Sequence, residues 1–323
     1  MPIRMEHDAL LLGQLRVSIH RTLRVPDDGT DYPLPPSLGR FPLRPVATLR
    51  NRPAQWRSHD FFVPIHQREA AWIGFGTTEG VPIAVQVGIG GVNAVTGQSW
   101  DFRPAIDPQN YIVCPDQPWI DGVLTASGVV RQFLAVSTGS GYAVAEQLPG
   151  ADISPGIHLR AYPPRPERLA DIVDWATHRE DHDVRVAAAG DLGVGSGGRM
   201  RQRIYPDRYG VEVWDRSAET GLSVHLVVPG RYAELTGEEP PSSPITARDY
   251  TDAGLPWFDL DDENVETLPA TEDLATISSV REVDQDHNVP VAEEEVTQLR
   301  REQIQRIQRG VSPRDSQEPR SAI

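Results

Sequence analysis

Turn-forming residues are spread along the whole chain, and they limit the length of every element it can form. The 323 residues include 29 prolines and 27 glycines. Proline interrupts strand ladders and helices, and glycine favours turns. Between these breaks, short segments alternate apolar and polar residues, as strands do. The pattern predicts a mainly β protein, either a sandwich or two packed β units, with proline-rich loops and few helices.

The alternation places most strands in the first two thirds of the chain. Single strands are predicted at 14–25, 60–65, 70–75, 82–87, 91–96, 110–114 and 157–162. Residues 121–136 predict a hairpin that turns at Ala126-Ser127-Gly128, and 211–215 with 222–228 predict a second hairpin. Apolar residues at helical spacing predict one internal helix over 168–179.

A further amphipathic helix is predicted near the C-terminus, over residues 292–309 of a helical element bounded at 291–310. The stretch AEEEVTQLRREQIQRIQR has high helix propensity. Its apolar side chains fall on one face, which must be buried against the body, a second copy or a protein partner. The residues of this candidate partner-binding stripe are Val296, Leu299, Ile304 and Ile307.

Composition predicts several units along the chain. Residues 231–323 carry 21 acidic residues and 9 arginines, whereas residues 1–230 carry 25 and 22. We expect a poorly ordered acidic linker before the C-terminal helix, because this stretch is sparsely apolar. The expected units are a first β unit at 1–162, a second β or mixed unit at 163–258, the linker at 259–290, the helix at 291–310 and a disordered tail at 311–323.

Several mechanisms are excluded by residues that the chain lacks. It contains no lysine, so a P-loop, a pyridoxal Schiff base and a protein-kinase centre are impossible. Its single cysteine, Cys114, excludes an internal disulfide and a cysteine zinc cluster. The acidic balance opposes nucleic-acid binding. The chain has no apolar run of 18 residues and no signal-peptide pattern, so we expect a soluble cytoplasmic protein without membrane contact, cofactor or metal.

A glycine-rich segment resembles a phosphate-binding loop. Glycines at 193, 195 and 198 match the spacing GxGxxG. A dinucleotide site needs this loop to open a helix within a βαβ unit, but an alternating segment and Pro206 follow it. Two interpretations remain open: a flexible strand connection, or an anion-binding nest formed by Gly195, Gly197, Gly198 and Arg199.

The candidate catalytic residues are scattered along the chain. His66 and Glu69 could form an acid–base pair, and Cys114 could be a nucleophile if His66 or His158 approached it. Asp101 or Asp121, each close in sequence to a tryptophan, could serve a carbohydrate-active enzyme. Each of these residues also has a purely structural interpretation, as a buried thiol or a strand end.

Two further clusters could bind a cation. His178 and His182 have ligand spacing if they are helical, although a solvated helix end explains them equally well. The acidic residues between Asp259 and Glu266 could collect a hard cation, but an unstructured acidic stretch also explains them.

Six strings carry a resemblance to a known family. They begin at Val63 (VPIHQREAAWI), Gly91 (GVNAVTG), Gln117 (QPWIDG), Gly128 (GVVRQF), Gly198 (GRMRQ) and Gly254 (GLPWF). The chain resembles, over roughly residues 10–280, a family of uncharacterised bacterial and fungal proteins. The resemblance implies no activity, and therefore no catalytic or binding residue.

Two functions are expected from the sequence. The first is a non-enzymatic binding or scaffold protein, because no motif has the residue types of a named chemistry and the C-terminal stripe needs a partner surface. The alternative is a hydrolase or carbohydrate-active protein that uses His66 with a carboxylate such as Glu69, Asp101 or Asp121.

Overall fold

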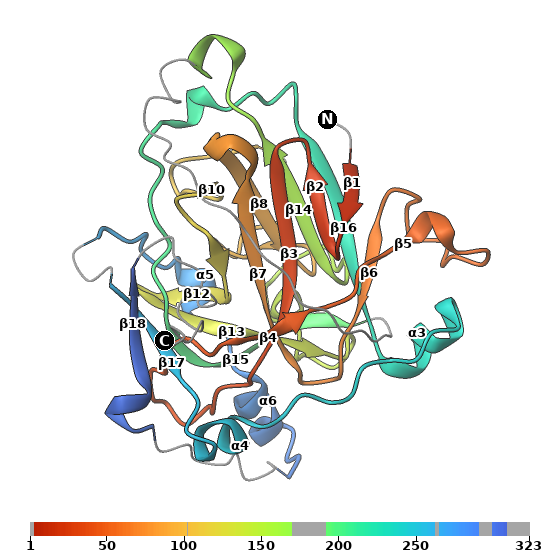
Figure 1. Ribbon diagram of the computed structural model, residues 1–323, viewed down its shortest axis with the longest axis vertical. Coiled ribbons are helices and arrows are strands. Elements are labelled where there is room, and N and C mark those ends of the chain that lie inside the picture. Colours follow the sequence, from red (N-terminus) through yellow and green to blue (C-terminus); the bar gives the residue numbers. More distant parts are fainter. Residues whose placement is uncertain (1–2, 102, 170–191, 262–264, 291–298, 309–323) are drawn as a thin grey trace, which may run out of the picture.

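Two β-sheets share one apolar core and lie at the centre of the fold (Figure 1). The computed structural model describes residues 3–101, 103–169, 192–261, 265–290 and 299–308. The mainly β prediction is confirmed. In the nine-stranded sheet the order is β1-β2-β3-β7-β13-β12, with β4 beside β3, β11 beside β7 and β15 beside β13. In the seven-stranded sheet it is β10-β8-β14-β16-β6-β5, with β9 beside β8.

The strands are short, as the spacing of turn residues predicts. Those of the nine-stranded sheet are β1 (Ile3–Glu6), β2 (Ala9–Leu12), β3 (Leu15–Thr22), β4 (Ser37–Arg40), β7 (Ala70–Thr77), β11 (Trp119–Ile120), β12 (Gly122–Ala126), β13 (Val129–Val136) and β15 (Gly193–Arg201). Those of the seven-stranded sheet are β5 (Arg44–Pro45), β6 (Phe61–Pro64), β8 (Ile83–Ile89), β9 (Val92–Asn93), β10 (Ile112–Cys114), β14 (Ile157–Tyr162) and β16 (Thr220–Val227). A separate parallel pair joins β17 (Trp257–Asp261) to β18 (Ile304–Gln308).

The helices in the described part of the chain are few and short. The α-helices are α1 (Val144–Gln147), α3 (Pro229–Thr236), α4 (Ala247–Asp252), α5 (Glu272–Ala275) and α6 (Val280–Asp286). The 3-10 turns are η1 (Val46–Thr48), η2 (Thr78–Gly80), η3 (Pro166–Arg168), η4 (Val211–Val213) and η5 (Arg301–Gln303). The predicted second hairpin is wrong in its first strand, because 211–213 forms η4.

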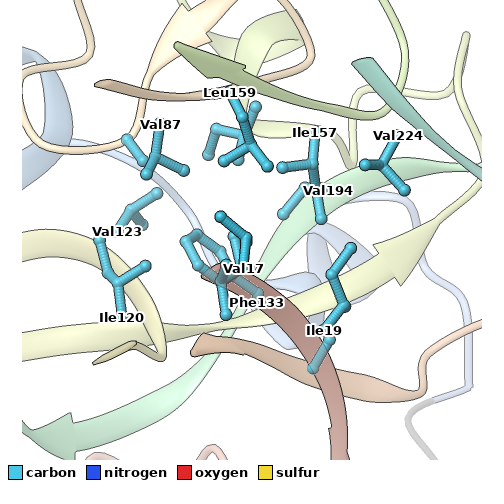
Figure 2. Close-up of a cluster of buried hydrophobic side chains, with 14 of the residues drawn as sticks. Val17, Ile19, Val87, Ile120, Val123, Phe133, Ile157, Leu159, Val194 and Val224 are labelled. Atoms are coloured by element: carbon cyan, nitrogen blue, oxygen red, sulfur yellow. The ribbon is translucent and has the colours of Figure 1, made fainter. Parts of the chain in front are cut away.

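The core lies between the two sheets. Successive side chains of a strand point to opposite faces, so Val17 and Ile19 of β3 face inward. They meet Val87, Leu159 and Val224 of the seven-stranded sheet, as Figure 2 shows. Each of these side chains is almost fully buried, which stabilises the fold by roughly 1.5–3 kcal/mol per residue.

The outer face of the nine-stranded sheet is covered by the β17–β18 pair. Trp72 and Trp119 lie on this face and pack against Phe258 and Ile307. The outer face of the seven-stranded sheet carries two separate apolar clusters, one around Trp214 and one around Trp56. Polar side chains of β14 and β16, described below, also lie on this outer face.

The expected division into units does not match the sheets. β15 pairs with β13, and β16 lies between β14 and β6, so strands on both sides of residue 162 share both sheets. The acidic stretch expected to be poorly ordered contains α5 and α6. The side chain of Asp284 in α6 accepts two hydrogen bonds from Arg68, which anchors α6 to the body.

The predicted C-terminal helix is corrected where the structure describes it. Residues 301–303 form η5, and 304–308 form β18, paired in parallel with β17. Helix propensity favoured a helix here, but the pairing with β17 and the burial of Ile307 favour a strand. Residues 291–298, with the first part of the predicted helix, and residues 309–323, with its last two residues and the predicted tail, lie outside the described part of the chain.

Candidate functional site

His66 and Glu69 are close together but do not form an acid–base pair. One carboxylate oxygen of Glu69 accepts a hydrogen bond from Arg21 at 2.5 Å, and the other accepts from the backbone N–H of His66 at 2.8 Å. The His66 ring instead donates from Nε2 to the carbonyl oxygen of Pro241. Burial raises the pKa of Glu69, and Arg21 and the His66 N–H oppose the shift. Glu69 therefore holds the turn after β6.

Cys114 and Asp121 occupy separate buried positions. The Cys114 side chain lies in the core between the sheets, and burial raises the pKa of its thiol, so the reactive thiolate is disfavoured. Asp121 follows β11 and pairs with Gln202 through both its backbone N–H and its carboxyl group. Burial raises the pKa of Asp121 to about 7, although Gln202 and Trp119 oppose the shift. The hydrogen bonds of Asp121 and Glu69 go to different residues, and Asp101 is exposed.

The glycine-rich segment is a strand, which corrects both the flexible-connection and the anion-nest interpretations. Residues 193–201 form β15 and pair with β13. A Cβ on Gly198 would lie 2.2 Å from the Pro26 carbonyl oxygen, and one on Gly195 or Gly197 would meet Val136 or Leu134 within 2.9 Å. Glycine is required here because neighbouring chain approaches closely. Arg199 pairs with Asp31 at 2.6 Å.

The residues of the predicted partner-binding stripe face their own chain where they are described. Ile307 is buried against Trp72 and Trp119, and Leu299 packs against the main core. Ile304 is half-buried, and Val296 lies outside the described residues. His178 and His182 also lie outside the described residues. Asp259 of the predicted cation cluster pairs with Arg201 at 2.8 Å.

A different group of polar residues meets on the outer face of the seven-stranded sheet. In the strand register, His158 of β14 lies opposite Ser223 of β16 on one side and Gly88 of β8 on the other. The hydroxyl of Ser223 lies 2.9 Å from Nδ1 of His158. Both residues are mostly buried, with 5% and 7% of their surface exposed.

The hydrogen bonds of His158 fix which atom of the pair donates and which accepts. Nε2 of His158 lies 2.9 Å from the carbonyl oxygen of Ser154, which can only accept. Nε2 therefore carries the hydrogen, and in the neutral ring Nδ1 is the acceptor. The Ser223 hydroxyl consequently donates to His158. Burial lowers the pKa of His158, so the neutral ring is favoured at pH 7.

Asp60 connects this pair to the loop before β6. Its carboxylate accepts hydrogen bonds from the Ser223 backbone N–H at 3.0 Å, from Arg57 and from His225. Arg57 also donates from Nη2 to the Ser223 hydroxyl at 3.0 Å. Burial alone would raise the pKa of Asp60, but the hydrogen bonds from His225, Ser223 and Arg57 hold it below 3.8. Asp60 is therefore a buried, charged group that positions Ser223.

Two tryptophans flank the pair. Trp56 stacks on His225 with ring centroids 4.3 Å apart. The Trp100 ring lies over Gly88, where a Cβ would come within 2.6 Å of it, and its centroid is 5.9 Å from that of His158. Gly88 is therefore needed to seat Trp100 beside His158. We define Ser223, His158, Asp60, Arg57 and Trp100 as the Ser–His site.

The sequence carried part of this signal. The alternation in LSVHLVV places Ser223 and His225 on one face of a strand, opposite the apolar residues. It does not contain the register that brings His158 beside Ser223, nor the path of the loop that brings Asp60 to β16.

No group of three or more His, Cys, Asp or Glu side chains that could hold a metal ion occurs among the described residues. None of the described helices is long and apolar enough to cross a membrane. Comparisons with protein-family models, curated proteins and solved structures find no match to this chain.

Proposed function

We propose that the chain is an acyl hydrolase in which Ser223 is the nucleophile and His158 the general base. The observation that carries the proposal is the hydrogen bond from the Ser223 hydroxyl to Nδ1 of His158. The Ser154 carbonyl fixes the tautomer of the His158 ring. A hydroxyl bound to a base that a third group orients is the arrangement that activates a serine. The proposal keeps the hydrolase alternative expected from the sequence and assigns it to other residues.

The reaction has two steps. Ser223 Oγ attacks the carbonyl carbon of an ester while His158 Nδ1 takes the hydroxyl proton. The bond to the leaving alcohol then breaks, and the alcohol takes that proton from His158. Water attacks the acyl-serine, gives its proton to His158, and releases the acid as the proton returns to Ser223 Oγ.

The proposal is tested by ester hydrolysis with the purified full chain. We expect hydrolysis of 1-naphthyl esters, followed by naphthol fluorescence, to be abolished by Ser223→Ala. The matched control is Ser18→Ala, because Ser18 is an equally buried serine hydrogen-bonded to a histidine in the other sheet. Thermal melting of both variants separates loss of chemistry from loss of fold.

The competing explanation is that the pair only satisfies two buried polar groups. In that case Ser223→Ala lowers the melting temperature and leaves any hydrolysis unchanged. Equal hydrolysis by the wild type and Ser223→Ala would therefore contradict the proposal.

A non-enzymatic binding or scaffold role is the second proposal. The sequence favours this role because the apolar stripe of the C-terminal segment needs a partner surface. In the structure, Ile307 and Leu299 pack against their own chain. Among the stripe residues that are described, Leu299 and Ile304 keep partial exposure, whereas Ile307 is buried. The mass of the full chain in solution tests the self-association form of this role, and a monomer would remove it.

A further inference from the structure

We infer that the Ser–His site selects esters whose acyl group ends in a carboxylate and whose alcohol is apolar. The inference rests on the proposed function and concerns its substrate class. It follows from the different side chains on the two sides of the Ser223–His158 pair, which the strand order β8-β14-β16-β6 places in a line.

The β6 side of the pair carries a guanidinium and an imidazole that reach solvent. The Arg57 side chain is 54% exposed, and that of the neighbouring His59 is 51% exposed. Arg57 uses Nε and Nη2 to bind Asp60 and Ser223. Among the residues that the structure describes, its Nη1 makes no hydrogen bond. A guanidinium held in this way beside the nucleophile can bind a carboxylate through its remaining donor.

The β8 side is apolar at the pair and acidic at its rim. Trp100 lies beside His158. Ile153, which is 45% exposed, precedes Ser154, whose carbonyl oxygen orients the His158 ring. Asp101 and Asp152, the neighbours of these two residues, are exposed. An anionic group is repelled on this side, whereas a flat apolar group packs on the Trp100 ring.

The chemistry assigns the two ends of the substrate to the two sides. His158 returns its proton to the leaving alcohol, so the alcohol must lie on the His158 side, next to Trp100. The acyl group stays bonded to Ser223 and therefore extends toward Arg57. A carboxylate at the far end of the acyl chain then meets the guanidinium, and an apolar alcohol meets the tryptophan.

The test compares two esters that differ only at the acyl end. 1-Naphthyl glutarate and 1-naphthyl valerate have acyl chains of equal length, and only the first ends in a carboxylate. We expect kcat/KM to be about tenfold or more higher for the glutarate, as for a charge-assisted hydrogen bond. The preference is expected to disappear in Arg57→Gln and to persist in Arg57→Lys. The control Arg52→Gln, at an exposed arginine earlier in the same loop, is expected to keep it.

The ratio of the two substrates is the readout, because Arg57→Gln also removes a hydrogen bond to Ser223 and can slow both reactions. Equal or faster hydrolysis of the valerate by the wild type would overturn the inference and leave the hydrolase proposal intact. A preference that survives in Arg57→Gln would also overturn it. If neither ester is hydrolysed and a fluorophosphonate does not modify Ser223, the proposed function itself fails.

Discussion

The outer faces of the two sheets each hold a buried histidine next to a serine and a tryptophan. On the seven-stranded sheet, the hydrogen bonds of the histidine fix which ring nitrogen accepts the serine proton. His20, on the nine-stranded sheet, lies between two hydroxyls, Ser18 at 2.8 Å and Ser37 at 2.9 Å. A hydroxyl can donate or accept, so these two contacts do not fix which ring nitrogen of His20 is the base. His158, on the seven-stranded sheet, lies between a hydroxyl and a carbonyl, so its Nδ1 must accept.

The side chains around His20 and His158 also differ. His20 stacks on Trp72 with ring centroids 3.8 Å apart, and Trp72 is covered by the β17–β18 pair. His158 is flanked by Trp100, and its partner Ser223 by the half-exposed Arg57. A histidine–serine contact can therefore activate the serine only where the partner of the other ring nitrogen fixes the tautomer. The charged side chain at the rim, Arg57, is the second difference between the two sites.

Two buried aspartates sharpen the contrast. Asp60 beside Ser223 accepts hydrogen bonds from a guanidinium, an imidazole and backbone N–H groups, so its pKa lies below 3.8. Asp121, beside the nine-stranded sheet, has uncharged side-chain partners among the described residues, Gln202 and Trp119, and its pKa is raised to about 7. One sheet therefore keeps a buried charge near its serine, while the other keeps a carboxyl group that is partly neutral at pH 7.

The largest expected effect separates the two histidines. We expect His158→Gln to lower kcat/KM for ester hydrolysis about 10²–10⁴-fold, because glutamine cannot take the Ser223 proton. His20→Gln is expected to lower stability and to leave kcat/KM of the folded protein within about twofold, because His20 is not the base. Similar losses in both variants, measured on folded protein, would contradict the distinction.

The next effect separates the two aspartates. A carboxyl group whose pKa is raised on folding contributes stability below its unfolded pKa and loses it as the pH rises through the folded value. The free energy of unfolding of Asp121→Asn is therefore expected to rise relative to wild type by about 1.4 kcal/mol per pH unit between pH 4 and pH 7. Denaturant unfolding at several pH values measures this difference.

Asp60→Asn is the matched control for that experiment, with the opposite sign. The pKa of Asp60 is lowered, so its charge stabilises the fold above pH 3.8 and the variant is less stable than wild type at pH 7. Its deficit shrinks as the pH falls below that value. A pH-independent difference for both variants would show that neither carboxyl group has the assigned charge state.

A core substitution tests whether the covering strand is structural. Ile307→Ala is expected to lower the free energy of unfolding by about 2–5 kcal/mol, because it leaves a cavity against Trp72 and Trp119. Ester hydrolysis by the folded variant is expected to be unchanged, since Ile307 covers the other sheet. A melting temperature equal to wild type would contradict the packing, and a lost activity would show that the two faces are coupled.

The smallest effect is the dependence of the rate on pH. Because burial lowers the pKa of His158 from 6.5, kcat/KM is expected to fall to half its maximum at a pH below 6.5. Below the lowered pKa it is expected to fall about tenfold per pH unit, as the base becomes protonated. A half-maximal rate above pH 6.5, or a rise between pH 7 and pH 9, would point to a different base.

The fold class could be predicted from the sequence, whereas the site could not. Alternation placed β3, β7, β8 and the β12–β13 hairpin correctly, since these strands bury one face in the shared core. It failed at β15, because the reason for its glycines is the close approach of Pro26 and β13. It also failed at β18, where pairing with β17 overrides helix propensity.

The catalytic candidates failed for a related reason. His66 and Glu69 are neighbours in sequence, but each is occupied by a different structural contact. His158 and Ser223 are 65 residues apart and meet only through the register of β14 and β16. Register between distant strands, and the loop that brings Asp60 to them, depend on tertiary structure that no local pattern encodes.

The activation of Ser223 by His158 is tested most directly by covalent labelling of the full chain with a fluorophosphonate, followed by peptide mass spectrometry. This probe reacts with a serine hydroxyl that a base has activated. We expect a single phosphonylated serine, Ser223, with labelling lost in His158→Gln and retained in His20→Gln. Labelling of Ser18 in place of Ser223, or no labelling of Ser223 in the folded wild type, would contradict it.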